Sequence, residues 1–170
     1  LYVLRHAKSS WPSPGLGDFD RPLNGRGNRQ TELVANWLQE QTYCPDTIVC
    51  SPSNRTLQTY NGIAQAVSNS RFDTVDRLYH GSLEDYLQTI WAIDNTDQSL
   101  MIIGHNPACD ELARYILKST SPAFDKLMAH HFGTANLAVF DCDVDNWADI
   151  ERRTGSLLTT VRPKDIGQTG

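Results

Sequence analysis

Arginine and histidine residues follow three short apolar segments of the chain, each at the point where the segment ends. Arg5 and His6 follow the first segment, and Arg55 comes shortly after the second. His105 follows the third. The carboxyl ends of parallel strands meet at one edge of a sheet, where open α/β sheets bind their ligands. As parallel strands, the segments would bring these four side chains to one pocket of positive charge. The segments are Leu1–Leu4, Thr47–Cys50 and Leu100–Ile103.

Two guanidinium groups and two imidazole groups around one pocket suit phosphoryl transfer. A guanidinium group presents a planar fork of donors that matches two phosphate oxygens. Helices beginning after Arg55 and His105 would add backbone N–H groups and a favourable dipole. A neutral imidazole can attack phosphorus when a hydrogen bond holds its other ring nitrogen, and His6 is placed for that role. His105 can donate to the equatorial oxygens, whose charge must be balanced during transfer.

The elements that must position these residues alternate along the chain. Apolar residues recur at helical spacing over 33–38, 57–67, 83–90 and 112–117, with a further short helix expected at 124–128. Between them lie strand patterns, and this alternation predicts an α/β three-layer sandwich with a mostly parallel sheet and helices on both faces. The expected strands are Leu1–Leu4, Thr47–Cys50, Thr74–Val75, Leu100–Ile103, Ala135–Phe140 and Leu157–Val161.

The last two strands are joined by a polar link, Asp141–Gly155, which does not suit a buried crossover helix. We therefore expect them to be an antiparallel addition near the C-terminus. Length indicates one domain over residues 1–162, followed by a loose polar tail over 163–170. Pro12, Pro14, Gly15 and Gly17 predict a long irregular first loop, of the kind that often carries function.

Composition excludes several classes of protein. The net charge is −5 and no run of Lys or Arg forms a polybasic patch, so we expect no nucleic-acid partner. No apolar stretch is long enough to cross a bilayer, and no signal peptide is expected. The four cysteines are scattered without metal-ligand spacing, which favours reduced thiols in the cytoplasm and predicts neither a metal nor a cofactor.

The chain resembles the histidine phosphatase superfamily at Arg5-His6 after the first strand, at the Ser-Pro-x-x-Arg turn that ends in Arg55, and at the late Gly104-His105. The founding relatives of this superfamily are the cofactor-dependent phosphoglycerate mutases. The finer pattern is similar to its SixA-type phosphohistidine phosphatase branch, from Leu1 to about Val161. The motifs are Arg5–Trp11 (RHAKSSW), Asp18–Leu23 (DFDRPL), Asn24–Gly27 (NGRG) and Gly104–Pro107 (GHNP).

The resemblance implies a role for each matching residue. His6 would be the nucleophile and become transiently phosphorylated. Arg5, Arg55 and His105 would complete the phosphate pocket. Arg21 would be a further phosphate contact, although a solvated loop residue is an equally good interpretation of it.

The resemblance is incomplete at the proton donor. Larger members of the superfamily carry a glutamate general acid after the third strand, where this chain reads Leu78–Ser82 without one. His80, or Asp18 or Asp20 from the first loop, could act as the general acid instead. If His80 is not the acid, it would contact the substrate or order its own loop. A phosphoramidate needs less help from an acid than a sugar alkoxide, because its nitrogen is readily protonated.

The segment before Leu100 has room for one helix and no cap domain, which predicts an open site. An open site can accept a phosphorylated side chain presented by another protein but does not enclose a small substrate. The expected function is therefore phosphohistidine hydrolysis on a signalling or phosphotransfer protein.

Two alternatives stay open: a phosphomonoesterase acting on small molecules such as sugar phosphates or nucleotides, and a phosphate-binding module without turnover. A metal-binding protein is a poor third, because no carboxylate or cysteine stands at ligand spacing from the histidines. Taken singly, Arg5, His6, Arg55 and His105 could each be structural, and only their joint occurrence favours a site.

Overall fold

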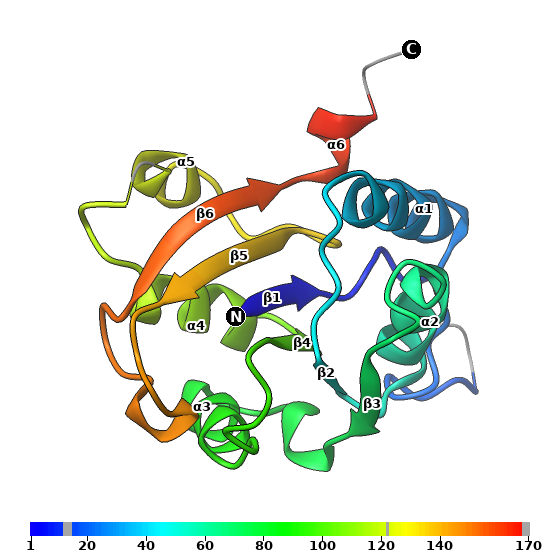
Figure 1. Cartoon of the computed structure of the whole chain (residues 1–170). Helices are drawn as coiled ribbons and strands as arrows, with labels where there is room; N and C mark the ends of the chain where they lie inside the picture. The colour runs from blue at the N-terminus through cyan, green and yellow to red at the C-terminus, as the bar shows by residue number, and fades with distance from the viewer. Residues whose placement is uncertain (12–14, 122, 168–170) are drawn as a thin grey trace.

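The central sheet has six strands in the order β3-β2-β4-β1-β5-β6 (Figure 1). In this computed structural model, residues 1–11, 15–121 and 123–167 are described. The first four strands pair in parallel, whereas β5 and β6 are antiparallel. The predicted mostly parallel sheet with antiparallel strands near the C-terminus is confirmed. The strands are β1 (Tyr2–Arg5), β2 (Thr47–Cys50), β3 (Arg71–Thr74), β4 (Leu100–Gly104), β5 (Leu137–Cys142) and β6 (Gly155–Val161).

The register of the parallel strands brings their carboxyl ends level. Arg5, the last residue of β1, lies opposite Gly104, the last residue of β4. The pairing continues past the strand ends, since the amide of His6 donates to the carbonyl of Gly104 at 2.9 Å. The amide of Ser51 donates in the same way to the carbonyl of Ile103 at 3.0 Å. The segments that follow β1, β2 and β4 therefore start at one edge of the sheet.

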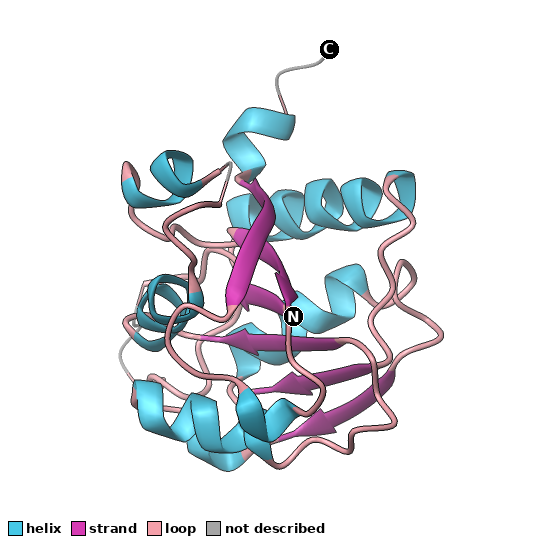
Figure 2. Cartoon of the chain, turned by 60° about the vertical axis from the view of Figure 1, so that its left-hand side comes forward, coloured by secondary structure: helices cyan, strands magenta, loops and turns pink. Residues whose placement is uncertain are grey.

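Helices cover both faces of the sheet (Figure 2). Side chains that cap the amino-terminal ends of α1 and α3 explain where these two helices begin. Asn24 accepts from the amide of Gly27 and so caps α1, while Ser82 and Asp85 form a reciprocal capping box at the start of α3. The helices are α1 (Gly25–Glu40), α2 (Asn54–Ile63), η1 (Asp76–Leu78), α3 (Leu83–Trp91), α4 (Ala108–Ile116), α5 (Phe124–Met128), η2 (Trp147–Asp149) and α6 (Pro163–Ile166).

Alternate side chains of the five strands other than β3 enter two separate apolar cores. Val3 of β1 and Ile102 of β4 belong to the core under α3 and α4. Leu4 of β1 and Ile103 of β4 belong to the core under α1 and α2. This period of two is the pleat of a strand, and a sheet buried on both faces needs apolar residues at every position. The three-layer arrangement follows from that pattern.

The structure differs from the expectation at β3 and at the C-terminal segment. β3 comprises Arg71–Thr74 rather than Thr74–Val75, because its exposed edge position allows polar residues that carry no apolar signal. Residues 163–166 form α6 instead of a loose tail, since Ile166 packs against the core under α1. The boundary at residue 162 stays a prediction. Pro12 and Pro14 of the predicted loop, and the last three residues, lie outside the described residues.

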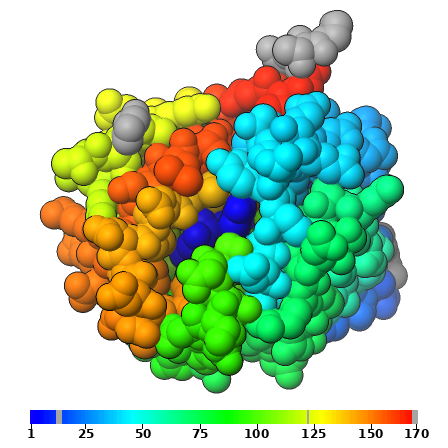
Figure 3. Space-filling view, viewed as in Figure 1, coloured from blue at the N-terminus to red at the C-terminus, as the bar shows by residue number. Residues whose placement is uncertain are grey.

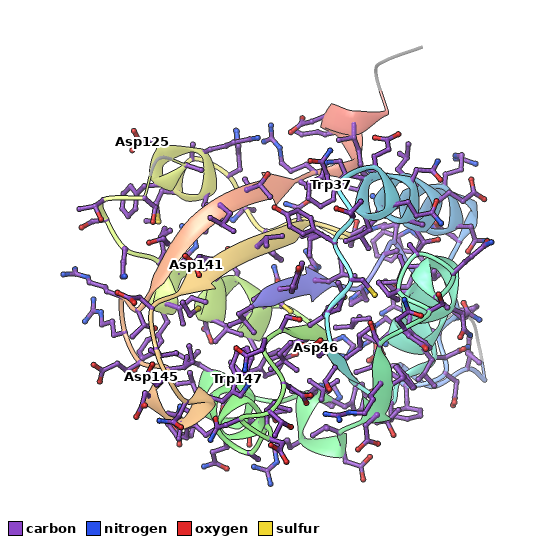
Figure 4. The ribbon with its side chains drawn as sticks, viewed as in Figure 1. Trp37, Asp46, Asp125, Asp141, Asp145 and Trp147 are labelled. Atoms are coloured by element: carbon purple, nitrogen blue, oxygen red, sulfur yellow. The ribbon has the colours of Figure 1, made fainter. Side chains whose placement is uncertain are left out.

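A hollow opens at the opposite, amino-terminal edge of the parallel strands, where Figure 3 shows β1 at its floor. Its volume is about 210 Å³, and none of the predicted site residues lines it. Trp147 closes one side of it, lying beside α3 (Figure 4) and donating from Nε1 to the carbonyl of Asp97 at 2.8 Å. Among the described residues, no helix is long and apolar enough to span a membrane. All four cysteines are free thiols.

Candidate active site

His6 and His105 lie across one cavity at the carboxyl edge of the parallel strands, with their ring centroids 5.1 Å apart. We call this the strand-end cavity; its volume is about 380 Å³. The structure thus brings together residues that are about 50 and 100 positions apart along the chain. Of the predicted site residues, those that line the cavity are Arg5, His6, Arg21, Arg55, His80 and His105. Asp18 and Asp20 do not line it.

The ring of His6 is held in one tautomer. Its Nδ1 lies 2.7 Å from the carbonyl oxygen of Ala7. A carbonyl oxygen only accepts hydrogen bonds, so Nδ1 carries the proton and Nε2 keeps a free lone pair in the neutral ring. Burial, together with the charges of Arg55 and Arg5, outweighs that hydrogen bond and lowers the pKa of His6 to about 4. At neutral pH His6 is an uncharged imidazole, the form that can attack phosphorus.

The second imidazole, His105, is positioned by two contacts. Its Nε2 lies 2.8 Å from the hydroxyl of Ser51, and its backbone amide donates to the hydroxyl of Tyr86 at 2.9 Å. Burial lowers the pKa of His105 to about 3, with the nearby charges of His6 and Arg55 acting in the same direction. Its Nδ1 is buried and has no hydrogen-bond partner among the described residues. His105 is therefore a fixed neutral ring beside the nucleophile candidate.

Gly104 allows this arrangement because Tyr86 packs directly over its backbone. A Cβ at position 104 would lie 2.1 Å from the hydroxyl oxygen of Tyr86, far inside van der Waals contact. Tyr86 comes from α3 and is fully buried, and its hydroxyl also donates to the carbonyl of Leu78 at 3.3 Å. The glycine before His105 is thus explained by close packing rather than by a turn.

Arg5 and Arg55 enter the cavity from different elements. Arg5 donates from Nη1 to the carbonyl of Phe132 at 2.9 Å, while its Nε is buried without a partner in the described chain. Burial lowers the pKa of Arg5 from its ordinary value. Arg55, in the first turn of α2, has a buried side chain that is 8% exposed. Both guanidinium groups stand where they can meet an anion in the cavity.

Asp18 binds Arg55 from outside the cavity. Arg55 donates from Nη1 to the backbone carbonyl of Asp18 at 2.6 Å and from Nη2 to its carboxylate at 3.0 Å. Arg21 and the hydroxyl of Tyr79 also donate to that carboxylate, at 2.8 and 3.1 Å. Burial alone would raise the pKa of Asp18, but these hydrogen bonds and the charge of Arg55 outweigh it and lower the pKa to about 2. The carboxylate is ionised at neutral pH.

The remaining predicted residues have distinct surroundings. Arg21 lines the cavity and is tied to the first loop, donating to the carbonyl of Ser10 and the hydroxyl of Ser9. His80 is exposed at the cavity mouth, its ring 3.9 Å from that of Tyr79. Asp20 is exposed, its carboxylate lies near Gly17, and it does not line the cavity.

Sequence reasoning missed several contributors to the site. Tyr86 carries only an apolar signal, because its position fits a helix stripe and its hydroxyl partners come from other elements. Tyr79 and Thr134 stand in loops with no motif around them. Asn106 belongs to the fourth motif, and its amide donates to the carbonyl of Phe132 at 2.8 Å. Of these four residues, Asn106 alone stands in one of the sequence motifs.

A family model described as "Histidine phosphatase superfamily (branch 1)" matches residues 1–89, just over half of the chain. The matched part holds β1, β2 and the segments that carry His6 and Arg55. The chain belongs to the histidine phosphatase superfamily. The resemblance drawn from the four motifs is confirmed.

Solved structures of this superfamily share the whole fold. The protein resembles SixA of Agrobacterium tumefaciens, a proposed phosphohistidine phosphatase, with 31% identity and a TM-score of 0.79 over 95% of this chain and 96% of that chain. SixA of Nakamurella multipartitia aligns over 95% of each chain with a TM-score of 0.82, and at 24% identity it shows the fold alone. The family match and the likeness to SixA of Agrobacterium tumefaciens make this histidine phosphatase a SixA-like hydrolase of the phosphatase class.

Relatives at the sequence level cover two thirds of the chain or more. The uncharacterized protein Rv1276c of Mycobacterium tuberculosis is 29% identical over 157 residues, which cover 91% of this chain and 96% of the relative. A protein of Picosynechococcus is 31% identical over 118 residues, or 68% of this chain and 72% of the relative.

Proposed function

We propose that this histidine phosphatase hydrolyses phosphohistidine on another protein through a covalent intermediate on His6. The observation that carries the proposal is the hydrogen-bond distance between Nδ1 of His6 and the carbonyl of Ala7. It leaves Nε2 unprotonated and directed away from that carbonyl, in a ring that lies across the cavity from His105. A nucleophile of this kind needs no base, because there is no proton to remove from the attacking atom.

The reaction would proceed in two displacements. In the first, the lone pair of Nε2 on His6 attacks phosphorus, the N–P bond of the substrate breaks, and the leaving imidazole takes up a proton. In the second, water attacks the phosphorus on His6, the new N–P bond breaks, and inorganic phosphate leaves. One water is consumed per turnover, and the enzyme returns to its starting state. No metal ion is required, because protein cations balance the charge on the phosphoryl oxygens.

Arg5, Arg55 and His105 are the groups we assign to those oxygens. The two guanidinium groups are permanently charged and line the same cavity as the imidazole pair. His105 is neutral and can donate one hydrogen bond from Nδ1, the ring nitrogen that lacks a protein partner in the described chain. This proton assignment follows if the hydroxyl of Ser51 donates to Nε2.

Asp18 is better suited to positioning than to proton donation. With its pKa lowered to about 2, its carboxyl group holds no proton at neutral pH. Its contacts fix Arg55, whose two terminal nitrogens both bind it. Asp20 does not line the cavity. We therefore assign proton donation, where the leaving group needs it, to His80 at the cavity mouth.

The shape of the site favours a substrate presented by a protein. Between β3 and β4, residues 75–99 hold only η1 and α3, so this segment carries no cap domain. His80 at the mouth is exposed. A phosphorylated side chain on a partner's surface can reach an open site of this kind. A small substrate would not be enclosed by it and would gain little binding energy from the surrounding protein. The 31% identity with SixA of Agrobacterium tumefaciens supports the same substrate class.

The test combines substrate choice with trapping of the intermediate. Wild-type protein should hydrolyse a phosphohistidine protein with a higher kcat/KM than sugar phosphates, nucleotides or aryl phosphates. His6→Ala should lose activity on every substrate by about 1,000-fold or more, since the attacking atom is removed. Acid-labile, base-stable label on His6 after rapid quench of the wild type would identify the phosphoenzyme.

Other results would redirect the assignment. Faster turnover of small phosphomonoesters than of phosphohistidine would assign the protein to that substrate class instead. Unchanged activity in His6→Ala would remove the nucleophile from the proposal. Phosphate binding without turnover of any substrate would indicate a binding module.

A further inference from the structure

A second, strongly basic depression adjoins the strand-end cavity. Its volume is about 480 Å³, and Arg5, Lys8 and Thr134 line both hollows. We call it the basic groove, after the five cationic residues that line it: Arg5, Lys8, Arg26, Arg162 and Lys164. Two histidines, His130 and His131, also line it, and no aspartate or glutamate does.

This concentration of charge runs against the composition of the protein. The chain has a net charge of −5, so a surface of average composition would be slightly acidic. In the described part of the chain, Arg5, Lys8, Arg26 and Lys164 form no salt bridge with any carboxylate. Uncompensated cations gathered on one surface create a local positive potential that attracts anions.

Arg162 shows that the groove retains donor capacity even where a carboxylate is present. Its Nε and Nη2 donate to the carboxylate of Asp165, at 2.6 and 3.1 Å. Its Nη1 is buried and has no hydrogen-bond partner among the described residues. A buried guanidinium nitrogen without an acceptor is costly, and an oxygen from a bound group would satisfy it.

The groove is assembled from segments that the fold holds in place. Lys8 follows β1, and its amide donates to the side-chain carbonyl of Gln30 on α1 at 2.9 Å. Arg26 stands in the first turn of α1, while Arg162 and Lys164 flank the start of α6, which lies near α1 (Figure 1). The cations of the basic groove therefore come from the segment after β1, the start of α1 and the start of α6.

We propose that the basic groove binds aspartate and glutamate side chains that flank the phosphorylated residue on the protein substrate. The inference rests on the proposed function, and it names a property of the partner that this function leaves open. Arg26 and Lys164 are exposed and make no side-chain hydrogen bond with another described residue. Exposed, solvated charges along a groove suit several carboxylates on a partner surface. A single buried phosphate would instead need donors that converge on one point.

The experiment compares two phosphohistidine peptides that differ only at the flanking positions. One carries Asp and Glu there, and the other carries Asn and Gln. The test variant is Arg26→Gln combined with Lys164→Gln, which leaves every residue of the strand-end cavity intact. The control variant is Arg29→Gln combined with Arg152→Gln, two exposed arginines that line neither hollow. An aryl phosphate reports basal activity in all three proteins.

In the test variant, KM for the acidic peptide should rise about tenfold at low salt, because two charge contacts are lost. Its kcat, its activity on the neutral peptide and its activity on the aryl phosphate should stay at wild-type values. The control variant should behave as wild type. Added salt should raise the wild-type KM for the acidic peptide and have little effect on the neutral one.

A binding measurement separates this inference from the proposed function. The unphosphorylated acidic peptide, labelled for fluorescence anisotropy, should bind wild-type protein more tightly than the test variant, whether or not phosphohistidine is turned over. Equal KM changes for both peptides, or equal anisotropy in wild type and test variant, would overturn the proposal. A small bisphosphate tests the remaining alternative. If it inhibits aryl phosphate hydrolysis by the wild type but not by the test variant, and peptide binding is the same in both proteins, the groove binds a second phosphate and the proposal is overturned.

Discussion

Asp18 binds Arg55 through both terminal nitrogens of the guanidinium group, at 2.6 Å to its backbone carbonyl and at 3.0 Å to its carboxylate. The same carboxylate accepts from Arg21 and Tyr79. A loop residue thus orients an arginine of the first turn of α2 from outside the cavity. This relationship separates positioning of the phosphate pocket from proton transfer to the leaving group, and kinetics can tell the two apart.

Asp18→Asn should lower kcat/KM by about 10- to 100-fold, because an amide cannot hold Arg55 with an ionic hydrogen bond and the guanidinium group shifts. The loss should be similar for a good leaving group such as 4-nitrophenol and for a poor alkyl alcohol. A proton donor would show a small loss with the first and a large loss with the second. Asp20→Asn is the matched control and should keep wild-type rates. A loss in Asp18→Asn confined to the alkyl phosphate would make Asp18 the acid.

The protonation state of His6 can be read directly from its ring resonances. With nitrogen-15 in the imidazole, Nδ1 should appear protonated and Nε2 unprotonated at pH 7, as the hydrogen bond to Ala7 requires. The titration midpoint should be near 4, because burial and the neighbouring arginines disfavour the cation. Arg5→Gln should raise this midpoint by removing one of those charges. A midpoint at the ordinary value of about 6.5 would contradict the buried, neutral nucleophile.

Stability should fall on acidification between pH 6.5 and about 4. In this window the unfolded chain protonates His6 and His105, whose folded pKa values are lowered to about 4 and about 3, so the unfolded state binds more protons. Above pH 6.5 both states are neutral and the two rings contribute no slope. Each histidine should add about 1.4 kcal/mol of lost stability per pH unit.

Urea unfolding in a phosphate-free buffer at several pH values measures this slope. In His6→Gln, the dependence of the unfolding free energy on pH should be smaller by roughly 1.4 kcal/mol per pH unit, the contribution of one histidine, since glutamine does not titrate. Identical slopes in wild type and His6→Gln would show that His6 titrates in the folded protein as it does in the unfolded chain.

Tyr86→Phe should destabilise the protein by about 1–3 kcal/mol and lower kcat more than it raises KM. The substitution leaves the buried amide of His105 without its acceptor, at 2.9 Å in the wild type, and frees the backbone that places this ring. Thermal unfolding and steady-state kinetics measure the two effects. Tyr60→Phe, on a partly buried tyrosine of α2 stacked on Phe72, is the control and should change neither kinetic constant. Wild-type kinetics in Tyr86→Phe would remove Tyr86 from the positioning of His105.

Gly104→Ala tests the close packing at the end of β4. A methyl group at this position would meet the hydroxyl of Tyr86 at 2.1 Å, so strand or ring must move. The expected cost is about 1–3 kcal/mol of stability, together with a loss of activity as His105 is displaced. Gly133→Ala, where the nearest atom is a side-chain oxygen 3.3 Å away, should be far milder. Equal unfolding free energies for the two variants would contradict the packing argument.

The sequence by itself determined the sheet and the residues at its carboxyl edge. Apolar runs with helical stripes between them leave few alternatives to a parallel sheet covered on both faces, and parallel strands bring their carboxyl ends to one edge. The grouping of Arg5, His6, Arg55 and His105 around one cavity follows from that topology. The bounds of β3 were not predicted correctly, because an exposed edge strand needs no apolar residues.

Only the tertiary structure decided what each group does within the cavity. The tautomer of His6 depends on where the carbonyl of Ala7 points, and the role of Asp18 depends on the path of a loop toward Arg55. Neither is encoded in a periodic pattern, because loop conformation is set by contacts between distant segments. The basic groove also could not be predicted from the sequence. Its cations come from β1 and the segment after it, from α1 and from the C-terminal end of the described chain, and they meet only after folding.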